Sequence, residues 1–412
     1  MNSTPSIRRC RLLLLEPRHL LEFRLDVVFA GGDGLRANQG WLALAPHLDT
    51  PCQVEPDLLA LLGQIEPERW QTAPCALEAP LLRRLIDLHL VFVEGTDSLQ
   101  ARRDEQLRGM KWWQPAAVMH WMARWQGRDS VSALYAAGLQ SAEGLHRQLG
   151  PPPEATMCLE GPRTPLPRHS AGPLDILLES RSTCRNFDPT RSLPLATFAR
   201  IMQRAFSATG EFMAAEGSVF LKKNAPSAGG LHPTEVYVLV QGVEGVEPGL
   251  YHYHPQHHEL TRLPDPPGSV RTWAKVAMAG QHWFADAQVL AILAPRYARS
   301  YWKYRDHPKA YRAITLDVGH LSQLLLLCAT EQGLGAFVTA AINEQDIEQV
   351  LNIDPMEQSP LAICGFGWRG EQMVTAEFDP GQRVWNAPLA TSGDGQGDQP
   401  ASKSTSTAPS PT

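Results

Sequence analysis

The hydrophobic pattern is most regular in the second half of the chain. Apolar residues recur at helical spacing over residues 310–331 and cover most of the helix surface, which predicts a helix buried in a core or in a subunit interface. Residues 194–209 have one apolar face and predict a helix that Gly210 ends. Residues 174–180 predict a shorter helix. Apolar runs that predict strands lie at residues 235–240, 289–294 and 360–366. Helices and strands interleave irregularly, which favours an α+β fold over a doubly wound sheet.

The N-terminal part has a different order of elements. Residues 54–65 and 79–88 predict two helices, and residues 88–95 predict a strand that ends in a turn. Helix, helix, strand is the order of a winged-helix module, which binds DNA or binds a peptide at its strand edge. Only Arg83 and Arg84 suggest a basic recognition helix, so DNA binding is disfavoured.

Residues 107–125 contain an unusual density of tryptophan. The aromatic positions are Trp112, Trp113, Trp121 and Trp125, with His120 between them. We expect a buried helix that packs onto the second domain. The alternative is an aromatic wall that lines a substrate channel.

Proline and polar residues divide the chain. Residues 149–173 are too rich in proline for a helix interior or a central strand, so they predict a linker. An N-terminal module would then cover residues 1–148 and a larger domain residues 174–389. Residues 390–412 are almost free of apolar side chains and predict a disordered tail.

Composition excludes several classes of protein. Of the 412 residues, 43% are hydrophobic, enough for a core, and the net charge of −6 disfavours a partner that is nucleic acid or an anionic membrane. The seven cysteines are scattered and form no Cys-x-x-Cys pair, which suits a reducing compartment. No uncharged apolar run is long enough to span a bilayer. These features predict a cytoplasmic protein.

The common catalytic motifs are missing from the sequence. It contains no nucleophile elbow, no phosphate-binding P-loop and no dinucleotide-binding glycine motif after a strand. Four histidines, at positions 252, 254, 257 and 258, could suggest a metal, but they flank turn residues and indicate an exposed hairpin instead. We therefore expect no metal.

Residues 181–187 are the first candidate for chemistry. Arg181 and Arg185 lie four residues apart with Ser182 and Thr183 between them, a set of donors that suits a phosphate. The alternative is a helix end with solvated arginines. Residues 224–237 then run from a glycine-rich loop into a strand, and Gly229 and Gly230 would let the backbone approach a planar ligand.

These motifs resemble those of the nitroreductase-like FMN flavoproteins. The Arg-x-Thr-x-Arg-x-Phe pattern at 181–187 matches their first motif. Residues 226–233 match the second at Pro226, Ser227 and Pro233, but Gly230 and His232 replace its usual amides. Residues 333–340 match the third, with Ala340 in place of the last glycine. The resemblance implies a central mixed or antiparallel sheet flanked by helices.

Further motifs resemble one branch of that family, the SagB-type dehydrogenases of thiazole- and oxazole-forming peptide maturation. They are residues 227–237, 248–253, 302–304, 311–312 and 317–323. In that branch a Lys-Tyr pair carries the chemistry, and it falls here on Lys303 and Tyr304. Lysine carries a proton at neutral pH unless it is desolvated, so one member of the pair must be activated. Both side chains can reach one site only if a loop follows, and Pro308 permits one.

The resemblance also implies the cofactor, its contacts and the partners. FMN would lie at the interface of a homodimer, and the N-terminal module would clamp the leader of a precursor peptide. Cyclodehydratase proteins are possible further partners. The implied flavin contacts are Arg181, Ser182, Thr183, Arg185, Ser227, Gly229, Gly230, His232, Val338, Thr339, Ala340 and, after the last strand, Arg369 or Arg383.

The implied reaction is FMN-dependent oxidation of a peptide-borne thiazoline or oxazoline to the azole. Two alternatives stay open. The same pocket would serve an NAD(P)H-dependent nitro or quinone reductase, or a dehydroamino-acid reductase. A flavin-binding scaffold that only docks a peptide to other enzymes is the non-catalytic alternative, and the Lys303-Tyr304 pair argues against it.

Overall fold

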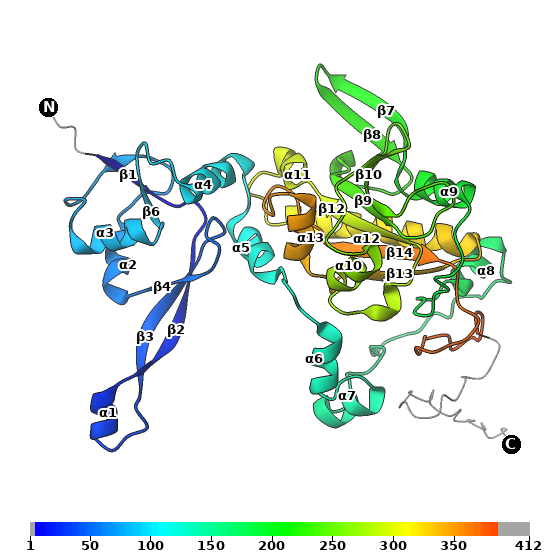
Figure 1. Ribbon diagram of the computed structural model, residues 1–412, viewed down its shortest axis with the longest axis horizontal. Coiled ribbons are helices and arrows are strands. Elements are labelled where there is room, and N and C mark those ends of the chain that lie inside the picture. The colour runs from blue at the N-terminus through cyan, green and yellow to red at the C-terminus, as the bar shows by residue number, and fades with distance from the viewer. Residues whose placement is uncertain (1–4, 386–412) are drawn as a thin grey trace. The chain divides into compact units, whose positions relative to one another are not determined.

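The computed structural model describes residues 5–385 (Figure 1). The predicted disordered tail, 390–412, lies outside these residues. Contacts divide the chain into two compact units. Among the described residues, unit 1 comprises 5–124, 296–315 and 353–359, and unit 2 comprises 125–295, 316–352 and 360–385. This division does not test the boundaries at 148 and 173, which stay a prediction.

The first layer of unit 1 is a small antiparallel sheet covered by two helices. Its strand order is β5-β1-β6, with β1 at Ser6–Arg9, β5 at Gln71–Thr72 and β6 at Val91–Val93. The helices are α2 (Pro56–Gly63) and α3 (Pro80–Asp87), so both predicted helices are confirmed and the predicted strand is shorter than expected. Leu58, Leu62, Leu82 and Leu85 are buried in its core. Whether this module works as a winged helix stays a prediction.

A long hairpin in the same unit was not predicted from the sequence. Strands β2 (Leu14–Phe23) and β3 (Leu35–Leu44) pair over ten residues each, β4 (Cys52–Val54) extends them, and α1 (Leu25–Phe29) lies between β2 and β3. Ala43 at the base of the hairpin is buried, but Leu21, Phe23 and Leu35 farther out are exposed, so most of the hairpin has no buried face that would give an alternating pattern. Gly34 has a positive φ of 81°, and a Cβ there would lie 2.5 Å from the ring of Phe23.

Two further helices of unit 1 follow β6 along the chain. They are α4 (Leu99–Met110) and α5 (Gln114–Ala123), and the unit also contains α11 (Tyr297–Lys303). The predicted tryptophan-rich helix is therefore broken. Trp112 and Trp113 lie in the connection between α4 and α5, and Trp125 follows α5.

Unit 2 is built on a six-stranded antiparallel sheet in the order β11-β10-β9-β12-β14-β13. The strands are β9 (Thr234–Val240), β10 (Gly249–His254), β11 (Glu259–Arg262), β12 (Val289–Pro295), β13 (Gly335–Thr339) and β14 (Ala362–Gly367). The three predicted strands are confirmed, and so is the α+β class.

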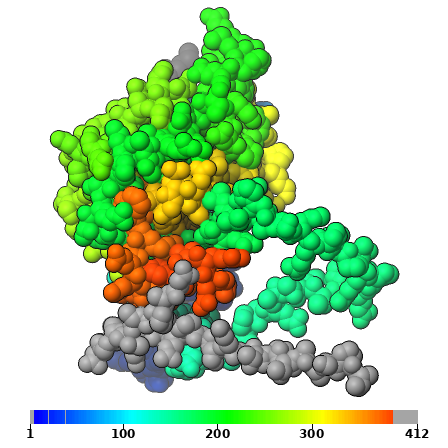
Figure 2. Space-filling view, turned by 90° about the vertical axis from the view of Figure 1, so that its right-hand side faces the viewer, coloured from blue at the N-terminus to red at the C-terminus, as the bar shows by residue number. Residues whose placement is uncertain are grey.

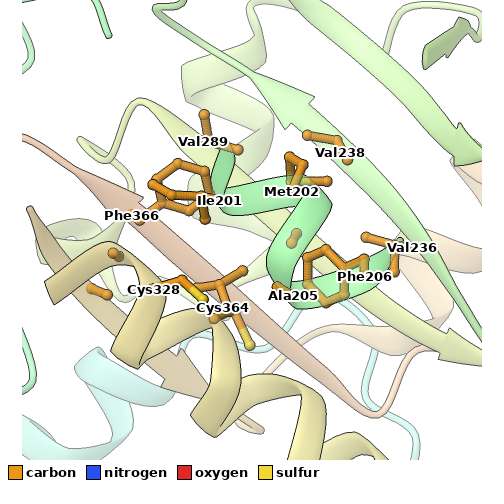
Figure 3. Packing of buried hydrophobic residues seen from close by; sticks show 14 of the residues in the cluster. Ile201, Met202, Ala205, Phe206, Val236, Val238, Val289, Cys328, Cys364 and Phe366 are labelled. Carbon is orange, nitrogen blue, oxygen red and sulfur yellow. The ribbon is translucent and has the colours of Figure 1, made fainter. Parts of the chain in front are cut away.

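Helices cover both faces of this sheet, so the strands β9, β12 and β14 are buried on both sides. On one face, α9 (Leu195–Phe206) and α12 (Ala310–Glu331) pack on Val236, Val238 and Phe366 (Figure 3). On the other face, α10 (Val270–Ala277) and α13 (Glu344–Leu351) pack on Tyr237 and Leu239. The remaining helices of the unit are α6 (Ser130–Ala136), α7 (Ala142–Leu149), α8 (Pro173–Ser180) and the short η1 (Ala228–Gly230) and η2 (His282–Phe284).

One predicted helix end is wrong. Helix α9 ends at Phe206, not at Gly210, and Gly210 lies inside a hairpin formed by β7 (Ala208–Ala215) and β8 (Ser218–Lys223). The amide of Ala208 donates to the carbonyl of Pro255 at 2.9 Å, and Ala208 pairs with Lys223. These tertiary and cross-strand bonds outweigh the local helix signal. The hairpin projects from its unit in both views (Figures 1 and 2).

Helix α12 matches its predicted bounds. It is long and apolar enough to cross a membrane, but half of that apolar stretch is buried inside the structure. Its buried side chains, such as Leu321 and Leu325, belong to the sheet core. This is the pattern of a core helix.

The proline-rich stretch behaves as its composition predicts. Residues 151–172 form neither helix nor strand, and nearly all of them are exposed.

Candidate functional site

The structure brings the first and third motifs together. Thr183 forms a parallel bridge with Ala336 of β13, and the amide of Cys184 donates to the carbonyl of Ala336 at 2.9 Å. Gly335 permits this approach, because a Cβ there would lie 2.5 Å from the Cys184 sulfur. The Arg181–Phe187 segment therefore runs along the outer strand of the sheet.

Arg181 is the cation best placed to receive a ligand. It directly follows helix α8 and is half-buried. Its guanidinium makes no hydrogen bond or ion pair with any residue between 5 and 385. Nearby, Ser182 Oγ accepts a bond from Arg369 Nη2 at 3.3 Å, and Arg185 Nη1 donates to the carbonyl of Ala376 at 3.2 Å. A guanidinium that is neither solvated freely nor paired suits the cradle interpretation better than the capped-helix alternative.

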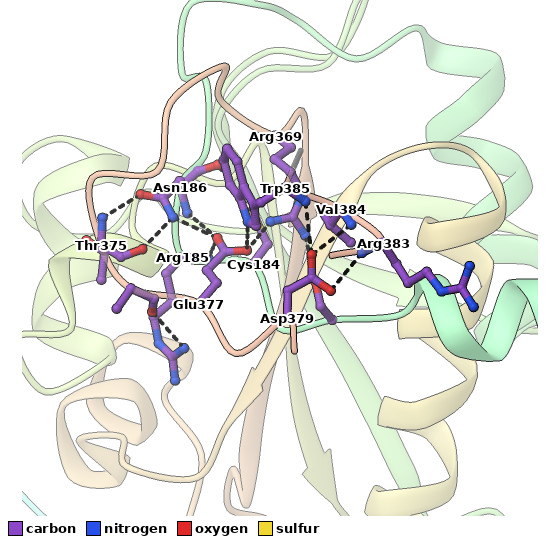
Figure 4. A network of polar contacts seen from close by, with 12 residues as sticks. Cys184, Arg185, Asn186, Arg369, Thr375, Glu377, Asp379, Arg383, Val384 and Trp385 are labelled. Carbon is purple, nitrogen blue, oxygen red and sulfur yellow. Dashed lines mark hydrogen bonds and ion pairs between the residues drawn. The ribbon is translucent and has the colours of Figure 1, made fainter. Parts of the chain in front are cut away.

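A buried carboxylate organises the same region (Figure 4). Glu377 accepts bonds from the amides of Arg185 (2.6 Å) and Asn186 (3.1 Å) and from the Trp385 ring nitrogen (2.8 Å). It also pairs with Arg369, and its own side chain is fully buried. Arg369 is thus largely neutralised by Glu377, which leaves it less charge for a phosphate. Sequence reasoning missed Glu377, since no local pattern marks it.

The other C-terminal arginine has a partner as well. Arg383 Nη2 lies 2.7 Å from Glu179 of α8, and both side chains are exposed. The choice between Arg369 and Arg383 as a phosphate contact stays a prediction.

Asp317 of α12 holds the glycine-rich loop. Ser227 Oγ donates to Asp317 Oδ2 at 2.5 Å, the amide of Ala228 donates to Oδ1 at 3.0 Å, and the amide of His232 donates to Ser227 Oγ at 2.9 Å. Burial raises the pKa of Asp317, while the bonds from Ser227 and Ala228 lower it. Gly229 and Gly230 have positive φ angles of 63° and 67°, which glycine adopts without strain.

Substitution of Asp317 by alanine is expected to destabilise this loop. The change leaves the Ser227 hydroxyl and the Ala228 amide without their acceptor, at about 1–3 kcal/mol for each unsatisfied group. We expect a lower Tm in thermal unfolding, and a smaller loss for Asp317→Asn, which keeps one acceptor oxygen. An unchanged Tm for Asp317→Ala would show that the loop does not depend on this carboxylate.

The second and third motifs end at the same end of the sheet. Thr339 at the end of β13 pairs with Ile363, which pairs with Ile292, and Ile292 pairs with Tyr237 near the start of β9. Three strand spacings separate β13 from β9, about 14 Å. The loop that precedes β9 and the residues that follow β13 therefore lie at the same end of the sheet.

At the end of β13, the three predicted contacts differ in exposure. Val338 and Ala340 are exposed, whereas Thr339 is buried. The Thr339 hydroxyl donates to Gln281 Oε1 at 3.1 Å and accepts from the amide of Ala341 at 3.2 Å. Thr339 is thus occupied within the protein, and its side chain is a weaker candidate for a ligand contact than sequence reasoning suggested.

Lys303 and Tyr304 belong to unit 1. Lys303 is the last residue of α11 and Tyr304 follows it, so a loop does begin at this pair. Lys303 Nζ lies 5.5 Å from the centre of the Tyr304 ring. Lys303 is exposed and Tyr304 is half-buried. The lysine ammonium therefore lies within cation–π range of the tyrosine ring.

A buried aromatic cluster packs against α11. Trp112 lies 4.7 Å from the rings of both Tyr297 and Tyr301, and its ring nitrogen donates to the carbonyl of Met356 at 3.1 Å. His120 lies 3.1 Å from the Tyr311 hydroxyl and 3.0 Å from the carbonyl of Pro355. The tryptophan-rich segment thus contributes to packing inside unit 1 and anchors the helix that carries Lys303.

Acid is expected to destabilise the protein through His120. Burial lowers the pKa of His120 from 6.5 to about 3, so the unfolded chain binds a proton there that the folded chain excludes. Stability is therefore lost as the pH falls from 6.5 towards 3, with a limiting slope of about 1.4 kcal/mol per pH unit. Urea unfolding at several pH values checks this. The His120→Gln variant should show a shallower slope, and an unchanged slope would contradict the assignment.

The histidine cluster lies on a hairpin, as expected, but only His257 is exposed, and His252, His254 and His258 are half-buried. His252 Nε2 lies 3.0 Å from Glu235, and His258 Nδ1 lies 2.8 Å from the Tyr253 hydroxyl, both around β10 and β11. Over residues 5–385, no group of three or more His, Cys, Asp or Glu side chains is arranged to hold a metal ion.

Residues 178–368 match the nitroreductase family. Three curated relatives are similar to this chain. MJ1384 of Methanocaldococcus jannaschii, whose name assigns it to the nitroreductases, is 32% identical over 193 residues, which are 47% of this chain and 89% of that protein. The trifolitoxin-processing protein TfxB of Rhizobium leguminosarum bv. trifolii is 31% identical over 34% of this chain and 38% of its own length.

The third relative is the microcin B17-processing protein McbC of Escherichia coli. It is 24% identical over 44% of this chain and 65% of its own length. The two peptide-processing relatives are thus matched over less than two thirds of their length. The chain belongs to the nitroreductase family and is distantly related to these two peptide-processing proteins.

Proposed function

We propose that the protein is an FMN-dependent dehydrogenase that oxidises thiazolines or oxazolines in a precursor peptide to thiazoles or oxazoles. The observation that carries this proposal is the Lys303-Tyr304 pair, with Nζ 5.5 Å from the phenol ring, in a chain related to two peptide-processing proteins. Members of the nitroreductase family are usually flavin oxidoreductases, and the Lys303-Tyr304 pair supports the finer assignment.

The residues present fit FMN. A phosphate needs cationic and hydroxyl donors, and the guanidinium of Arg181, unpaired within residues 5–385, precedes Ser182 and Thr183, of which Thr183 bridges to β13. The loop with Gly229 and Gly230 is rigidly held by Asp317 and presents backbone without side chains. We propose these residues as contacts of FMN, together with Arg185, Ser227, His232, Val338, Ala340 and Arg369. The buried Thr339 would hold the end of β13 in place through its bonds to Gln281 and Ala341.

The chemistry that FMN supplies when bound is acceptance of a hydride. The chain must then remove the proton from Cα of the azoline. Tyr304 or Lys303 would take that proton, and the two side chains lie beside each other, with Nζ 5.5 Å from the centre of the Tyr304 ring. Lys303 is exposed in the protein alone. A bound substrate would therefore have to exclude water from the ammonium before the lysine could lose its proton and act as a base.

A direct assay tests the proposal. The purified protein, loaded with FMN, is incubated with a synthetic peptide that already carries a thiazoline, so that only the oxidation is scored. We expect a loss of about 2 Da, the mass of the two hydrogens removed. Absence of this loss, together with NAD(P)H consumption on a nitroaromatic or a quinone, would favour the reductase. That alternative is supported by the similarity to the M. jannaschii relative.

A homodimer is expected, with the flavin shared between subunits. Most apolar residues of α12 are explained by the core of their own chain, but Leu316 is 57% exposed and lies near exposed Gly319, His320 and Gln323. This strip is the candidate contact. Light scattering should give about twice the chain mass of 45.5 kDa. A monomer that still binds FMN would contradict this expectation.

We propose the precursor peptide as the partner of the N-terminal module, and cyclodehydratase proteins as further partners. The module has two short sheet edges, at β5 and β6, that could take a peptide strand. A cytoplasmic location fits this role.

A further inference from the structure

The segment that contains Lys303 and Tyr304 is strongly basic. Residues 296–312 include six basic residues and one acidic residue, Asp306, in a chain whose net charge is −6. The basic residues are Arg296, Arg299, Lys303, Arg305, Lys309 and Arg312. The segment comprises α11, the following loop and the first residues of α12, all in unit 1.

Four of the six basic residues of this segment keep their charge unpaired within residues 5–385. Lys303, Arg305, Lys309 and Arg312 are exposed, and none forms an ion pair with another residue in the described part of the chain. The single acid, Asp306, pairs instead with Arg11 at 3.4 Å. Elsewhere in unit 1, cations such as Arg103 have close carboxylate partners, here Asp49 at 2.7 Å.

An exposed aromatic residue lies among these cations. Trp302 is 57% exposed, and its carbonyl accepts a bond from Arg305 Nε at 3.4 Å. Tryptophan and arginine are the residues most often found to carry binding energy at protein interfaces. We call Trp302, Arg305, Lys309 and Arg312 the basic surface.

Backbone hydrogen bonds hold the loop of the basic surface in place. The amide of His307 donates to the carbonyl of Tyr304, the amide of Asp306 donates to Lys111, and the amide of Ala310 donates to His307, at 2.8–3.2 Å. The cations therefore project from an ordered loop, which lowers the entropy cost of binding a ligand there.

We infer that the basic surface binds an acidic segment of the peptide substrate, next to the ring that is oxidised. The inference rests on the proposed function, because a ring that reaches Lys303 and Tyr304 must place its neighbouring residues close to this surface. An extended peptide advances about 3.4 Å per residue, so Asp or Glu residues within a few positions of the ring would meet these cations. Each exposed contact is weak, but together they steer and select acidic sequences.

A charge reversal away from the catalytic pair tests this inference. The double variant Lys309→Glu/Arg312→Glu is compared with Arg200→Glu/Lys275→Glu, whose residues are also exposed and unpaired within residues 5–385. Two fluorescein-labelled thiazoline peptides of equal length serve as probes, one with three Asp or Glu residues beside the ring and one with serines there. Binding to the FMN-loaded protein is followed by anisotropy at low and high salt.

We expect the acidic peptide to bind the Lys309→Glu/Arg312→Glu variant at least roughly tenfold more weakly than the wild type, and the serine peptide to bind about equally to both. The control variant should stay within about twofold, and salt should weaken only the binding of the acidic peptide. FMN content and circular dichroism verify that each variant is folded.

Other outcomes separate the two proposals. Equal binding of the acidic peptide to wild type and to the Lys309→Glu/Arg312→Glu variant would overturn the inference, even if azoline oxidation proceeds. NADPH binding that depends on Lys309 and Arg312, with peptide binding that does not, would also overturn it and assign the surface to a nucleotide phosphate. Charge-dependent peptide binding without oxidation would uphold the inference and refute the proposed function.

Discussion

Replacement of Lys303 by alanine is expected to slow azoline oxidation by roughly 10²- to 10⁴-fold while the protein keeps its FMN. Lys303 lies at the end of α11, is exposed and makes no ion pair within residues 5–385, so its removal should not disturb the fold. Tyr304→Phe keeps the ring near the lysine but removes the hydroxyl, and it shows whether the phenol carries the proton. Both are measured by the mass loss of a pre-formed thiazoline peptide, with flavin absorbance read in parallel.

The matched controls are Lys275→Ala and Tyr135→Phe, which change exposed side chains on other helices. Both should turn over like the wild type. If Lys303→Ala and Tyr304→Phe also stay within a few-fold of the wild type, the pair has no role in the transition state. The dehydrogenase proposal would then lose the observation that carries it.

Loss of Arg181 is expected to remove most of the bound FMN. Its guanidinium has no partner in the described residues, so the substitution should change the stability of the protein little. It would remove the charge-assisted hydrogen bonds that the guanidinium donates to a phosphate. Each such bond contributes about 1.5–3 kcal/mol. The double variant Arg181→Ala/Arg185→Ala should therefore bind FMN roughly 10²- to 10⁴-fold more weakly, as measured by flavin fluorescence titration.

Arg163→Ala/Arg168→Ala is the control, because it makes the same change in charge in the exposed stretch before α8. It should leave FMN content unchanged. Arg181→Lys should recover part of the affinity, since lysine keeps the charge but not the planar pair of donors. Full FMN content in the Arg181→Ala/Arg185→Ala variant would refute the cradle, and its melting temperature shows whether the loss of Arg185 also disturbs its bond to Ala376.

The hydrophobic pattern predicted an element correctly where the residues of that element alone favour its conformation. Helix α12 has the predicted bounds, because its apolar positions face a core and Gly333, with φ at 72°, ends the helix. Signals failed where pairing partners decide the conformation. Gly210 suggested a helix end, yet it lies in β7 because the backbone there pairs with β8.

Some residues of the candidate site could be identified from the sequence, and others could not. The sequence identified the motifs around Arg181, Ser227 and Val338, and family membership supports the fold that contains them. It gave no sign that Glu377 would neutralise Arg369, or that His120 would be buried beside Tyr311.

The sequence by itself determined helix α12, the strands β9, β12 and β14, the three spaced motifs and the resemblance to the family. Tertiary structure alone decided which charges remain available. Asn186 meets Glu377 across 191 positions, and His120 meets Tyr311 across the same separation. Residues so far apart share no helical or strand period, so their contact leaves no pattern in the chain. Such contacts decide which groups are occupied, and among the described residues none of them reaches the guanidinium of Arg181.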